Sequence, residues 1–250
     1  MGKRFEKEYH VYYYEVDSNL NCKIESLMNY FMEIGMQHSE SLGVGIDYLQ
    51  KENLSWIFYK YKINIKRYPK YGENIKIITE PIGFNRFLAS REYIVYDENN
   101  EIIVKAEAVL ILMDLIKRRM TRISEEQYDI YGIDKDKKSN IVLSKVKKIE
   151  NKMDSKNFEI KYSDIDSNKH VNNVKYVSYA IDSLSSEIIE KYSLSNIEIT
   201  FEKEAICGEV IKVEYEIIED NNELKILHKI FNEKDIEITS LESKWSLKEN

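Results

Sequence analysis

The residues Asp166-Ser167-Asn168-Lys169-His170-Val171-Asn172-Asn173 are the stretch from which the fold can be worked out. They stand between an alternating, strand-like segment and a long amphipathic one. A carboxylate, an amide and an imidazole occur at every second position. If the backbone is extended there, Asp166, Asn168 and His170 share one side of it and converge on one point. The pattern therefore predicts a site at this stretch.

A helix is predicted directly after the stretch and as far as Tyr192. Asn172 or Asn173 is the expected N-cap. The first turn of a helix has unpaired backbone N–H groups and the positive end of the helix dipole, so we expect it to stabilise a developing oxyanion beside His170. The apolar residues that mark the buried face recur three or four positions apart: Val174, Val177, Ile181, Leu184 and Ile188.

Composition limits the class of protein. A chain of 250 residues forms one large or two ordinary domains, and its 19 Tyr, 8 Phe and 2 Trp favour β structure. No run of about 18 apolar residues occurs, so no transmembrane helix and no membrane insertion are expected. The first ten residues lack the apolar core of a signal peptide, and a cytoplasmic location is the expectation.

Charge and cysteine content exclude further classes. The chain has 37 Lys and Arg against 44 Asp and Glu, a net charge of −7, which argues against nucleic-acid binding. Two cysteines, Cys22 and Cys207, make neither a disulfide framework nor a zinc site. We predict no metal and no cofactor.

The first half, residues 1–130, is predicted to be one domain of a strand, a long helix and a meander of strands. Turn residues such as Gly72 and Asn99-Asn100 separate the strands. The predicted strands are Glu8–Val16, Leu54–Lys66, Asn74–Ile82, Phe87–Tyr96 and Glu101–Asp114, and the predicted helix runs from Ile24 to Leu42.

The second half, residues 158–250, repeats this order after a linker. Residues 131–157 are rich in Lys and Asp and weakly patterned, which is typical of a linker. The helix after Asp166 follows a first strand and precedes four more. The predicted strands are Phe158–Tyr162, Asn196–Ala205, Val210–Glu219, Glu223–Phe231 and Ile236–Leu247.

Short matches indicate that the halves are copies. Asp17-Ser18-Asn19 matches Asp166-Ser167-Asn168 at an offset of 149 (166 − 17), and Gly72–Lys76 resembles Gly208–Lys212 at 136 (208 − 72). The extra residues of the first half are assigned to Gly43–Asn53. A sheet with one helix leaves a face uncovered, so two copies are expected to pack together. The layout resembles a tandem hotdog, an α+β fold of two antiparallel sheets that each wrap a long helix.

The two copies differ at the groups that carry chemistry. At these offsets His170 corresponds to Asn21, and Glu204 corresponds to Tyr68. We therefore predict one chemical site per chain, in the second half, with the first half shaping a pocket.

The run DSNKHVNNVKY, residues 166–176, resembles the signature of the acyl-acyl-carrier-protein thioesterases, enzymes that end fatty-acid synthesis by hydrolysing the thioester of acyl carrier protein (ACP). Three other stretches resemble the same family in the same order. They are Ile24–Tyr30, Lys66–Glu73 and Lys117–Ser124.

The resemblance implies catalytic roles for Asp166, Asn168 and His170. The family pattern also places a Glu directly before a Cys on a later strand. The Glu is present as Glu204, but Ala205 stands at the Cys position, and Cys207 is two residues further along. This departure weakens a Cys–His–Asn mechanism and favours one driven by a carboxylate.

The predicted mechanism uses Glu204 as the base, partly desolvated, with the attacking water held between Glu204 and His170. Asn168 and the helix N-terminus polarise the carbonyl, and Asp166 orients the loop. Each residue has a simpler interpretation. His170 could be structural, Asp166 and Asn168 could turn the chain as Asp17 and Asn19 do, and Glu204 could be a solvated charge.

Substrate contacts are predicted from weaker patterns. Met28 and Met32, with Met36, recur four positions apart and would line an acyl tunnel, although an ordinary core explains them equally well. Asn172 and Asn173 lie beside the predicted oxyanion position.

The predicted partner is an acidic ACP that carries the acyl chain on phosphopantetheine, and a homodimer is considered. An ACP-binding surface would include Arg67, Arg118 and Arg119, with Lys66, Lys117 and Arg122 as further candidates. Two other functions stay open: an acyl-CoA thioesterase of the hotdog superfamily, and a non-catalytic acyl-binding sensor.

Overall fold

The computed structural model describes residues 2–136, 139, 141, 143, 146–220 and 223–248. The chain divides into two compact units. The N-terminal unit comprises Met1–Tyr59 and Ile65–Leu143, and the C-terminal unit comprises Lys60–Asn64 and Ser144–Asn250. Among the described residues, no helix combines the length and the apolar character that a membrane span requires.

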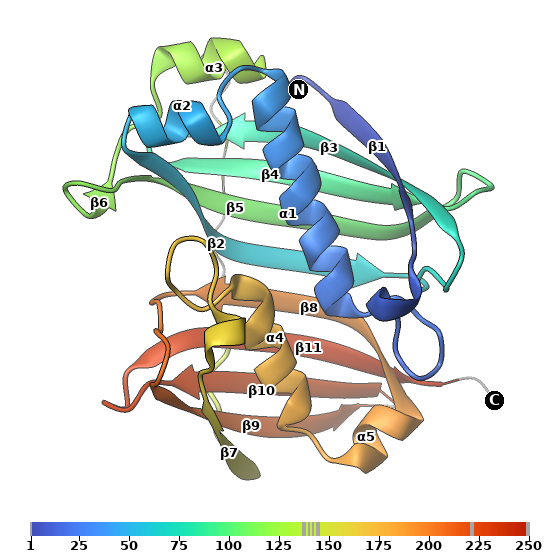
Figure 1. The fold of residues 1–250 in the computed structure, drawn as a ribbon. Coiled ribbons are helices and arrows are strands. Elements are labelled where there is room, and N and C mark those ends of the chain that lie inside the picture. Colours follow the sequence, from blue (N-terminus) through green and yellow to red (C-terminus); the bar gives the residue numbers. More distant parts are fainter. Residues whose placement is uncertain are drawn as a thin grey trace. The chain divides into compact units, whose positions relative to one another are not determined.

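The N-terminal unit is an antiparallel sheet with a helix across one face. Its strands follow the order β1-β3-β4-β5-β2, and α1 packs against β1 and β3 (Figure 1). Apolar residues of α1 at helical spacing, including Leu27, Phe31 and Ile34, are fully buried. The elements are β1 (Phe5–His10), η1 (Tyr13–Glu15), α1 (Ile24–Ser41), α2 (Ile46–Lys51), β2 (Leu54–Ile65), β3 (Asn74–Phe84), β4 (Leu88–Tyr96), β5 (Ile102–Asp114), β6 (Arg119–Met120) and α3 (Glu125–Tyr131).

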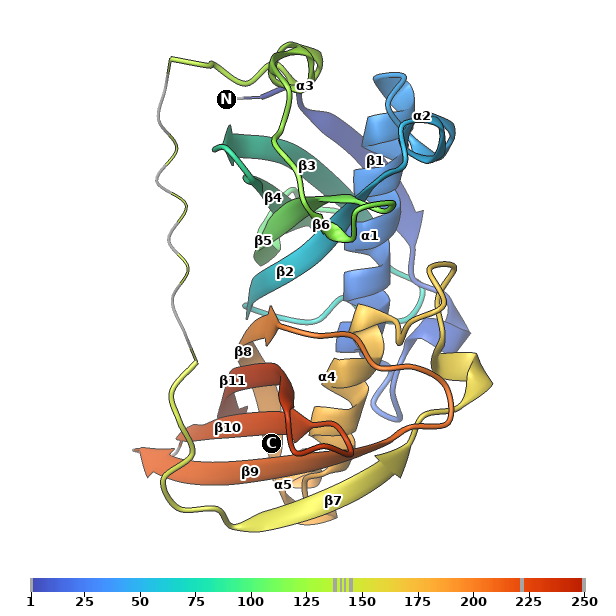
Figure 2. The ribbon, with the colours of Figure 1, turned by 90° about the vertical axis from the view of Figure 1, so that its left-hand side faces the viewer.

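The C-terminal unit has the same arrangement with a shorter helix. Its strands follow the order β8-β11-β10-β9-β7, and Lys60–Asn64 of β2 pairs antiparallel with β8. Helix α4 packs on this sheet at β10 (Figure 2). The elements are β7 (Asp154–Glu159), η2 (Tyr162–Asp164), α4 (Asn173–Asp182), α5 (Ser186–Lys191), β8 (Tyr192–Phe201), β9 (Val210–Asp220), β10 (Glu223–Phe231) and β11 (Glu237–Leu247).

The first strand of each unit begins and ends earlier than its side-chain pattern predicts. Strand β1 is Phe5–His10, not Glu8–Val16, and β7 is Asp154–Glu159, not Phe158–Tyr162. Both are edge strands that pair on one side, β1 with β3 and β7 with β9. Backbone pairing therefore sets their ends, and a short 3-10 turn follows each one.

The predicted helix from Asn173 to Tyr192 is broken, which corrects the expectation of a long helix in the second half. Helix α4 ends at Asp182, and α5 begins at Ser186. The Ser183 hydroxyl donates to the Ala180 carbonyl at 2.7 Å, and Ser185 is extended. Serine side chains that bond to nearby backbone compete with helix continuation, so the helix stops here.

The strand that follows the two helices, β8, begins and ends four residues earlier than predicted. Strand β8 spans Tyr192–Phe201, so Glu204 lies in the loop after it and not on the predicted strand Asn196–Ala205. The remaining strands lie within about two residues of the predicted ones. Part of the predicted linker, residues 131–157, lies outside the described residues. The last four residues of this predicted linker, 154–157, are the first four residues of β7.

Candidate active site

The loop of residues 166–170 is a tight turn and not the extended segment that the alternation predicts. The Asp166 N–H donates to the His170 carbonyl at 2.9 Å, and Lys169 has a φ of 67°. The Asp166 carboxylate accepts the backbone N–H of Asn168 at 2.8 Å and lies 3.5 Å from that of His170. An Asp that bonds to its own following backbone closes a turn. Asp166 thus orients the loop.

The turn separates the side chains that an extended backbone would have aligned. Asn168 is exposed at its tip, and its amide makes no hydrogen bond within the described part of the chain. The extended backbone on which the expected convergence of Asp166, Asn168 and His170 depends is therefore not found here.

His170 and Glu204 lie in direct contact. The Nε2 atom of His170 is 3.1 Å from Oε2 of Glu204, and the side chains are 28% and 48% exposed. Nε2 is therefore the ring nitrogen that faces the Glu204 carboxylate. The other ring nitrogen, Nδ1, is buried and has no hydrogen-bond partner in the described part of the chain.

This contact changes one detail of the expected mechanism. Nε2 of His170 and Oε2 of Glu204 are in direct contact at 3.1 Å, so no water lies between those two atoms. Glu204 is about half exposed, so its carboxylate is only partly removed from water. Its second carboxylate oxygen makes no hydrogen bond to the described residues.

The backbone of Ala205 connects the loop of Glu204 to the loop of His170. The Ala205 carbonyl accepts the Val171 N–H at 2.9 Å. The Ala205 N–H donates to the hydroxyl oxygen of Tyr176 at 3.1 Å. Tyr176 is buried, and burial raises the pKa of its phenol. Sequence reasoning missed this role, although Tyr176 ends the run from which the family was identified.

Helix α4 begins directly after this loop. Its N-cap is Asn172, whose side-chain oxygen accepts the Val174 N–H at 3.1 Å. That oxygen therefore caps the helix, which does not support the expected contact with substrate. Asn173, the first helical residue, is partly exposed. The positive end of the helix dipole lies three residues after His170 in the chain.

Asp164 fixes the helix from the other side of the loop. Its carboxylate accepts the Tyr179 hydroxyl at 2.9 Å and the Lys161 N–H at 2.9 Å, and it pairs with Lys175 at 3.1 Å. Burial opposes ionisation, but the hydrogen bonds from Lys161 and Lys175 outweigh it and lower the pKa of Asp164.

The N-terminal unit contains a matching loop without the chemical groups. The Asp17 N–H donates to the Asn21 carbonyl at 2.8 Å, and the Asp17 carboxylate accepts the N–H groups of Asn19 and Asn21 at 2.8 and 2.9 Å. Leu20 has a φ of 61°, as Lys169 has 67°. Asn21 stands where His170 does, so this loop has no imidazole.

One backbone bond of the N-terminal loop has no counterpart. The Tyr71 N–H donates to the Leu20 carbonyl at 2.9 Å. At the repeat offsets the corresponding pair is the Cys207 N–H and the Lys169 carbonyl, and these make no hydrogen bond within the described residues. The loop beside His170 is therefore less tightly closed than its counterpart.

Family models match both units. A model of the acyl-ACP thioesterase N-terminal domain matches residues 2–131, and a model of the C-terminal domain of the same family matches residues 147–247. The chain belongs to the acyl-ACP thioesterase family.

A curated relative, the chloroplastic acyl-acyl-carrier-protein hydrolase of Cuphea viscosissima, is 29% identical over 228 residues, which cover 84% of this chain and 54% of the relative. The chain thus spans about half the length of the first curated relatives that it matches.

Two solved structures resemble the whole chain. The crystal structure of a Lactobacillus plantarum protein assigned as an oleoyl thioesterase has a TM-score of 0.92 at 20% identity and covers 100% of this chain and 98% of that one. The 12:0-ACP thioesterase from Umbellularia californica has a TM-score of 0.83 at 20% identity and covers 98% and 94%. These matches show the fold, an antiparallel sheet with few helices, of the hotdog type.

The methionines predicted to line an acyl tunnel in this family member lie in different environments. Met28 is fully buried in the N-terminal unit, Met32 is partly exposed, and Met36 is 37% exposed. Met28 is therefore a core residue, and only Met32 has an intermediate position.

The three predicted ACP-binding arginines also differ. Arg67 makes two hydrogen bonds to Glu73, at 2.7 and 3.0 Å, and one to Asp97 at 2.8 Å. Two carboxylates thus already neutralise Arg67, which does not support its role in binding ACP. Arg118 and Arg119 are exposed and make no ion pair within the described residues.

The cysteines take no part in the pair of His170 and Glu204. Cys207 is exposed in the turn before Gly208, and Cys22 is buried. Among the described residues, no group of three or more His, Cys, Asp and Glu side chains is placed to hold a metal ion.

Proposed function

We propose that the protein hydrolyses the thioester of fatty acyl-ACP, which releases a free fatty acid and ends chain elongation. One observation carries the proposal. In a chain matched by both domain models of the acyl-ACP thioesterases, His170 Nε2 lies 3.1 Å from Glu204 Oε2. The pair occurs in the C-terminal unit, and Asn21 and Tyr68 stand at the corresponding positions of the N-terminal unit.

The proposed reaction uses Glu204 as the general base. His170 Nε2–H holds one carboxylate oxygen, and the other accepts a hydrogen bond from water. As the water oxygen attacks the thioester carbon, its proton passes to Glu204. The C–S bond then breaks, and the proton returns to the phosphopantetheine thiolate. A thiol with a pKa of about 8.5 is a good leaving group and needs little acid catalysis.

Stabilisation of the tetrahedral oxyanion is assigned to the first turn of α4. The positive dipole end of α4 and the Asn173 N–H, which has no hydrogen-bond partner among the described residues, are suited to this task. Such a donor lowers the barrier by about 3 kcal/mol. The exposed Asn168 amide, free of internal hydrogen bonds, is available to the substrate on the same loop. Asp166 holds that loop and makes no substrate contact in this mechanism.

We propose that the fold is a tandem hotdog, with residues 1–130 and 158–250 as its halves and residues 131–157 as the linker. Matched backbone bonds at both offsets support it. The Val11 N–H donates to the Glu73 carbonyl at 2.9 Å, and the Ile160 N–H donates to the Glu209 carbonyl at 2.9 Å. Gly72 and Gly208, which correspond at the offset of 136, have similar positive φ values of 81° and 88°. The C-terminal half carries the chemistry, and the N-terminal half is assigned to the acyl chain.

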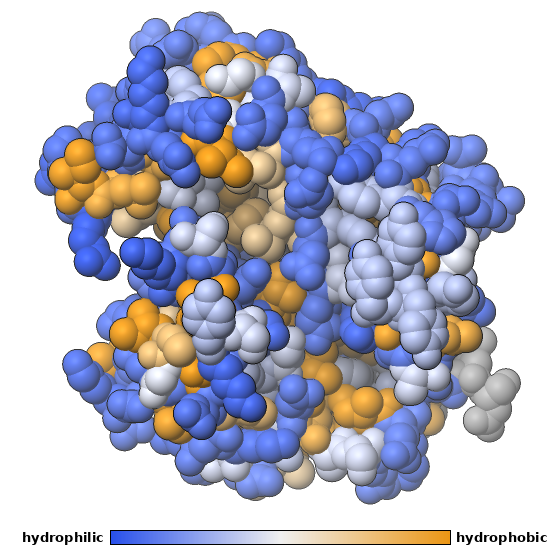
Figure 3. Space-filling view, viewed as in Figure 1, coloured by the Kyte–Doolittle hydropathy of each residue, from blue (hydrophilic) through white to orange (hydrophobic). Residues whose placement is uncertain are grey.

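ACP is proposed to bind at the β5–β6 hairpin, residues 114–120. Arg118 and Arg119 provide unpaired positive charge there, while Lys117 pairs with Asp114 at 3.1 Å. Three apolar side chains of the hairpin are at least half exposed: Leu115, Ile116 and Met120. In Figure 3, drawn in the same view as Figure 1, apolar residues lie next to hydrophilic residues at the position where Figure 1 labels β6.

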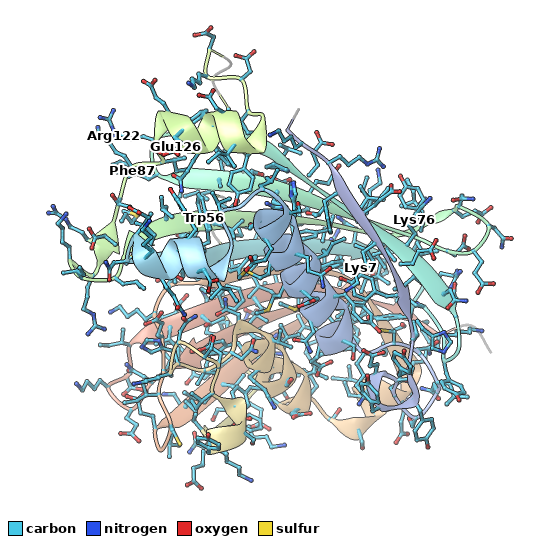
Figure 4. All side chains as sticks on the ribbon, turned by 45° about the horizontal axis from the view of Figure 1, so that its top comes forward. Lys7, Trp56, Lys76, Phe87, Arg122 and Glu126 are labelled. Carbon is cyan, nitrogen blue, oxygen red and sulfur yellow. The ribbon has the colours of Figure 1, made fainter. Side chains whose placement is uncertain are left out.

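Arg122 extends this basic surface toward α3, and its side chain points outward (Figure 4). Basic side chains beside exposed apolar ones complement an acidic partner that also buries apolar area. The homodimer stays a prediction.

The test is a release assay on acyl-ACP substrates of graded chain length, with acyl-CoA of the same lengths in parallel. We expect hydrolysis of acyl-ACP, and a loss of at least 100-fold in kcat in His170→Ala and in Glu204→Ala. Glu202→Gln is the matched control, because Glu202 is an exposed carboxylate on the same loop. Faster hydrolysis of acyl-CoA would reassign the substrate. Binding of acyl chains without hydrolysis would contradict the enzymatic function.

A further inference from the structure

We propose that Tyr176 is a positioning residue, whose buried hydroxyl oxygen binds the Ala205 N–H and so holds Glu204 against His170. The inference rests on the proposed function of this site, and it concerns how the two reacting side chains are kept together. Tyr176 itself does not touch substrate in this account.

The first support is the way in which Ala205 is held. Ala205 is 1% exposed and directly follows Glu204. Its carbonyl accepts the Val171 N–H at 2.9 Å, and its N–H donates to Tyr176 at 3.1 Å. Val171 directly follows His170. Both hydrogen bonds therefore act within one residue of the pair that lies 3.1 Å apart.

The second support is the corresponding place in the N-terminal unit. There the Cys22 N–H donates to the Pro69 carbonyl at 2.7 Å, the equivalent of the bond between Val171 and Ala205. Proline has no N–H, so the second hydrogen bond is not needed. At the offset of Tyr176 stands Leu27, which has no acceptor.

The donor and its acceptor thus occur together in the half that contains Glu204, and both are replaced in the other half. A role in general stability would be equally useful in both halves. The comparison therefore connects Tyr176 to the chemistry of its own half.

The physical consequence follows from burial. A buried backbone N–H that loses its partner costs free energy, and the chain moves to avoid that cost. The loop of residues 202–209 lies at the surface, with Glu202, Lys203 and Glu204 exposed. Without Tyr176 the Ala205 N–H would turn toward solvent, and Glu204 would move away from His170.

The test compares Tyr176→Phe with Tyr179→Phe. Tyr179 lies on the same helix, is also buried, and donates its hydroxyl proton to Asp164 at 2.9 Å, away from the Glu204 loop. With acyl-ACP we expect kcat to fall at least tenfold in Tyr176→Phe with KM within twofold of wild type, and to stay within twofold in Tyr179→Phe. An unchanged kcat in Tyr176→Phe would overturn the proposal.

A second readout needs no substrate and so stands if the proposed function fails. The ring ¹⁵N chemical shifts of His170 report whether Nε2, the nitrogen 3.1 Å from Glu204 Oε2, carries the proton. We expect Tyr176→Phe to weaken this Nε2–H signature as Glu204→Gln does, and Tyr179→Phe to retain it. Retention in Tyr176→Phe would overturn the inference even if the enzyme is active.

Ala205→Pro removes the donor and keeps Tyr176. It should lower kcat and weaken the Nε2–H signature in the same way, and it replaces Tyr176→Phe as the decisive variant if that protein does not fold. The double variant Tyr176→Phe/Ala205→Pro should regain thermal stability without regaining kcat. Recovery of both would mean that Tyr176 only satisfies a buried N–H, and would refute a positioning role.

Discussion

Asp166 and Asp17 hold two loops in the same conformation, each by accepting backbone N–H groups two and four residues ahead. The distances are 2.8 and 3.5 Å at Asp166 and 2.8 and 2.9 Å at Asp17. The two loops differ in the residue that they present, His170 or Asn21. Their shared geometry separates the structural work of the loop from its chemistry.

Asp166→Ala and Asp17→Ala are therefore a matched pair. Each removes an acceptor from two backbone N–H groups, and we expect the free energy of unfolding to fall by about 1–2 kcal/mol in both. Only Asp166→Ala should lower kcat, by about tenfold or more, since only its loop carries His170. Urea denaturation and the acyl-ACP assay measure the two effects. An equal loss of activity in both variants would show that the effect is one of stability alone.

Cys207→Ala tests the alternative nucleophile. Cys207 is exposed in a turn two residues beyond Ala205, and it takes no part in the contact of His170 with Glu204. We expect kcat to stay within about twofold of wild type. A loss of 100-fold, about 3 kcal/mol in the barrier, would restore a thiol mechanism. Glu204→Gln, assayed beside it, shows the size of loss expected for a reacting group.

Charge reversal tests the β5–β6 hairpin as the ACP-binding surface. Arg118→Glu/Arg119→Glu should raise KM for acyl-ACP about tenfold and leave hydrolysis of a short acyl-pantetheine thioester unchanged, because the chemistry lies elsewhere. Lys105→Glu/Lys234→Glu is the control for net charge, since Lys105 and Lys234 are exposed and lie outside the hairpin. The difference between the double variants should shrink at high salt. An equal rise in KM in the control would show that only the net charge matters.

The strand pattern and the chemical differences between the halves could be predicted from the sequence because they depend on local residue type. Strands β9 to β11 lie within about two residues of the predicted ranges, and His170 and Glu204 were singled out because Asn21 and Tyr68 replace them in the other half.

Features set by partners far apart in the chain were not predictable in this way. Arg67 is bound by Asp97, 30 residues away, and Ala205 is bound by Tyr176, 29 residues away. The ends of β1 and β7 follow from pairing with distant strands. The turn at Asp166 was missed for a local reason. Alternating polar residues are typical of extended backbone, but Asp and Asn also close turns.

A buried histidine of the C-terminal unit makes stability depend on pH. His228 on β10 is 2% exposed, and the one group that opposes the effect of burial on its pKa is the backbone of Ala180. Burial lowers the pKa of His228 from 6.5 to about 3. The unfolded chain therefore binds a proton between these two values while the folded one does not, so this stabilisation is complete above pH 6.5 and is lost as the pH falls toward 3.

From this difference we expect His228 to lower the free energy of unfolding by about 2 kcal/mol between pH 7 and pH 5. His228→Leu should remove that share of the pH dependence, while His10→Gln, on the exposed side of β1, should leave it unchanged. His38, whose pKa burial lowers to about 4, adds a similar dependence in all three proteins, so the difference between their slopes is the quantity to compare. Urea denaturation at the two pH values measures it. If His228→Leu retains the full wild-type slope, protonation of His228 does not contribute to acid destabilisation.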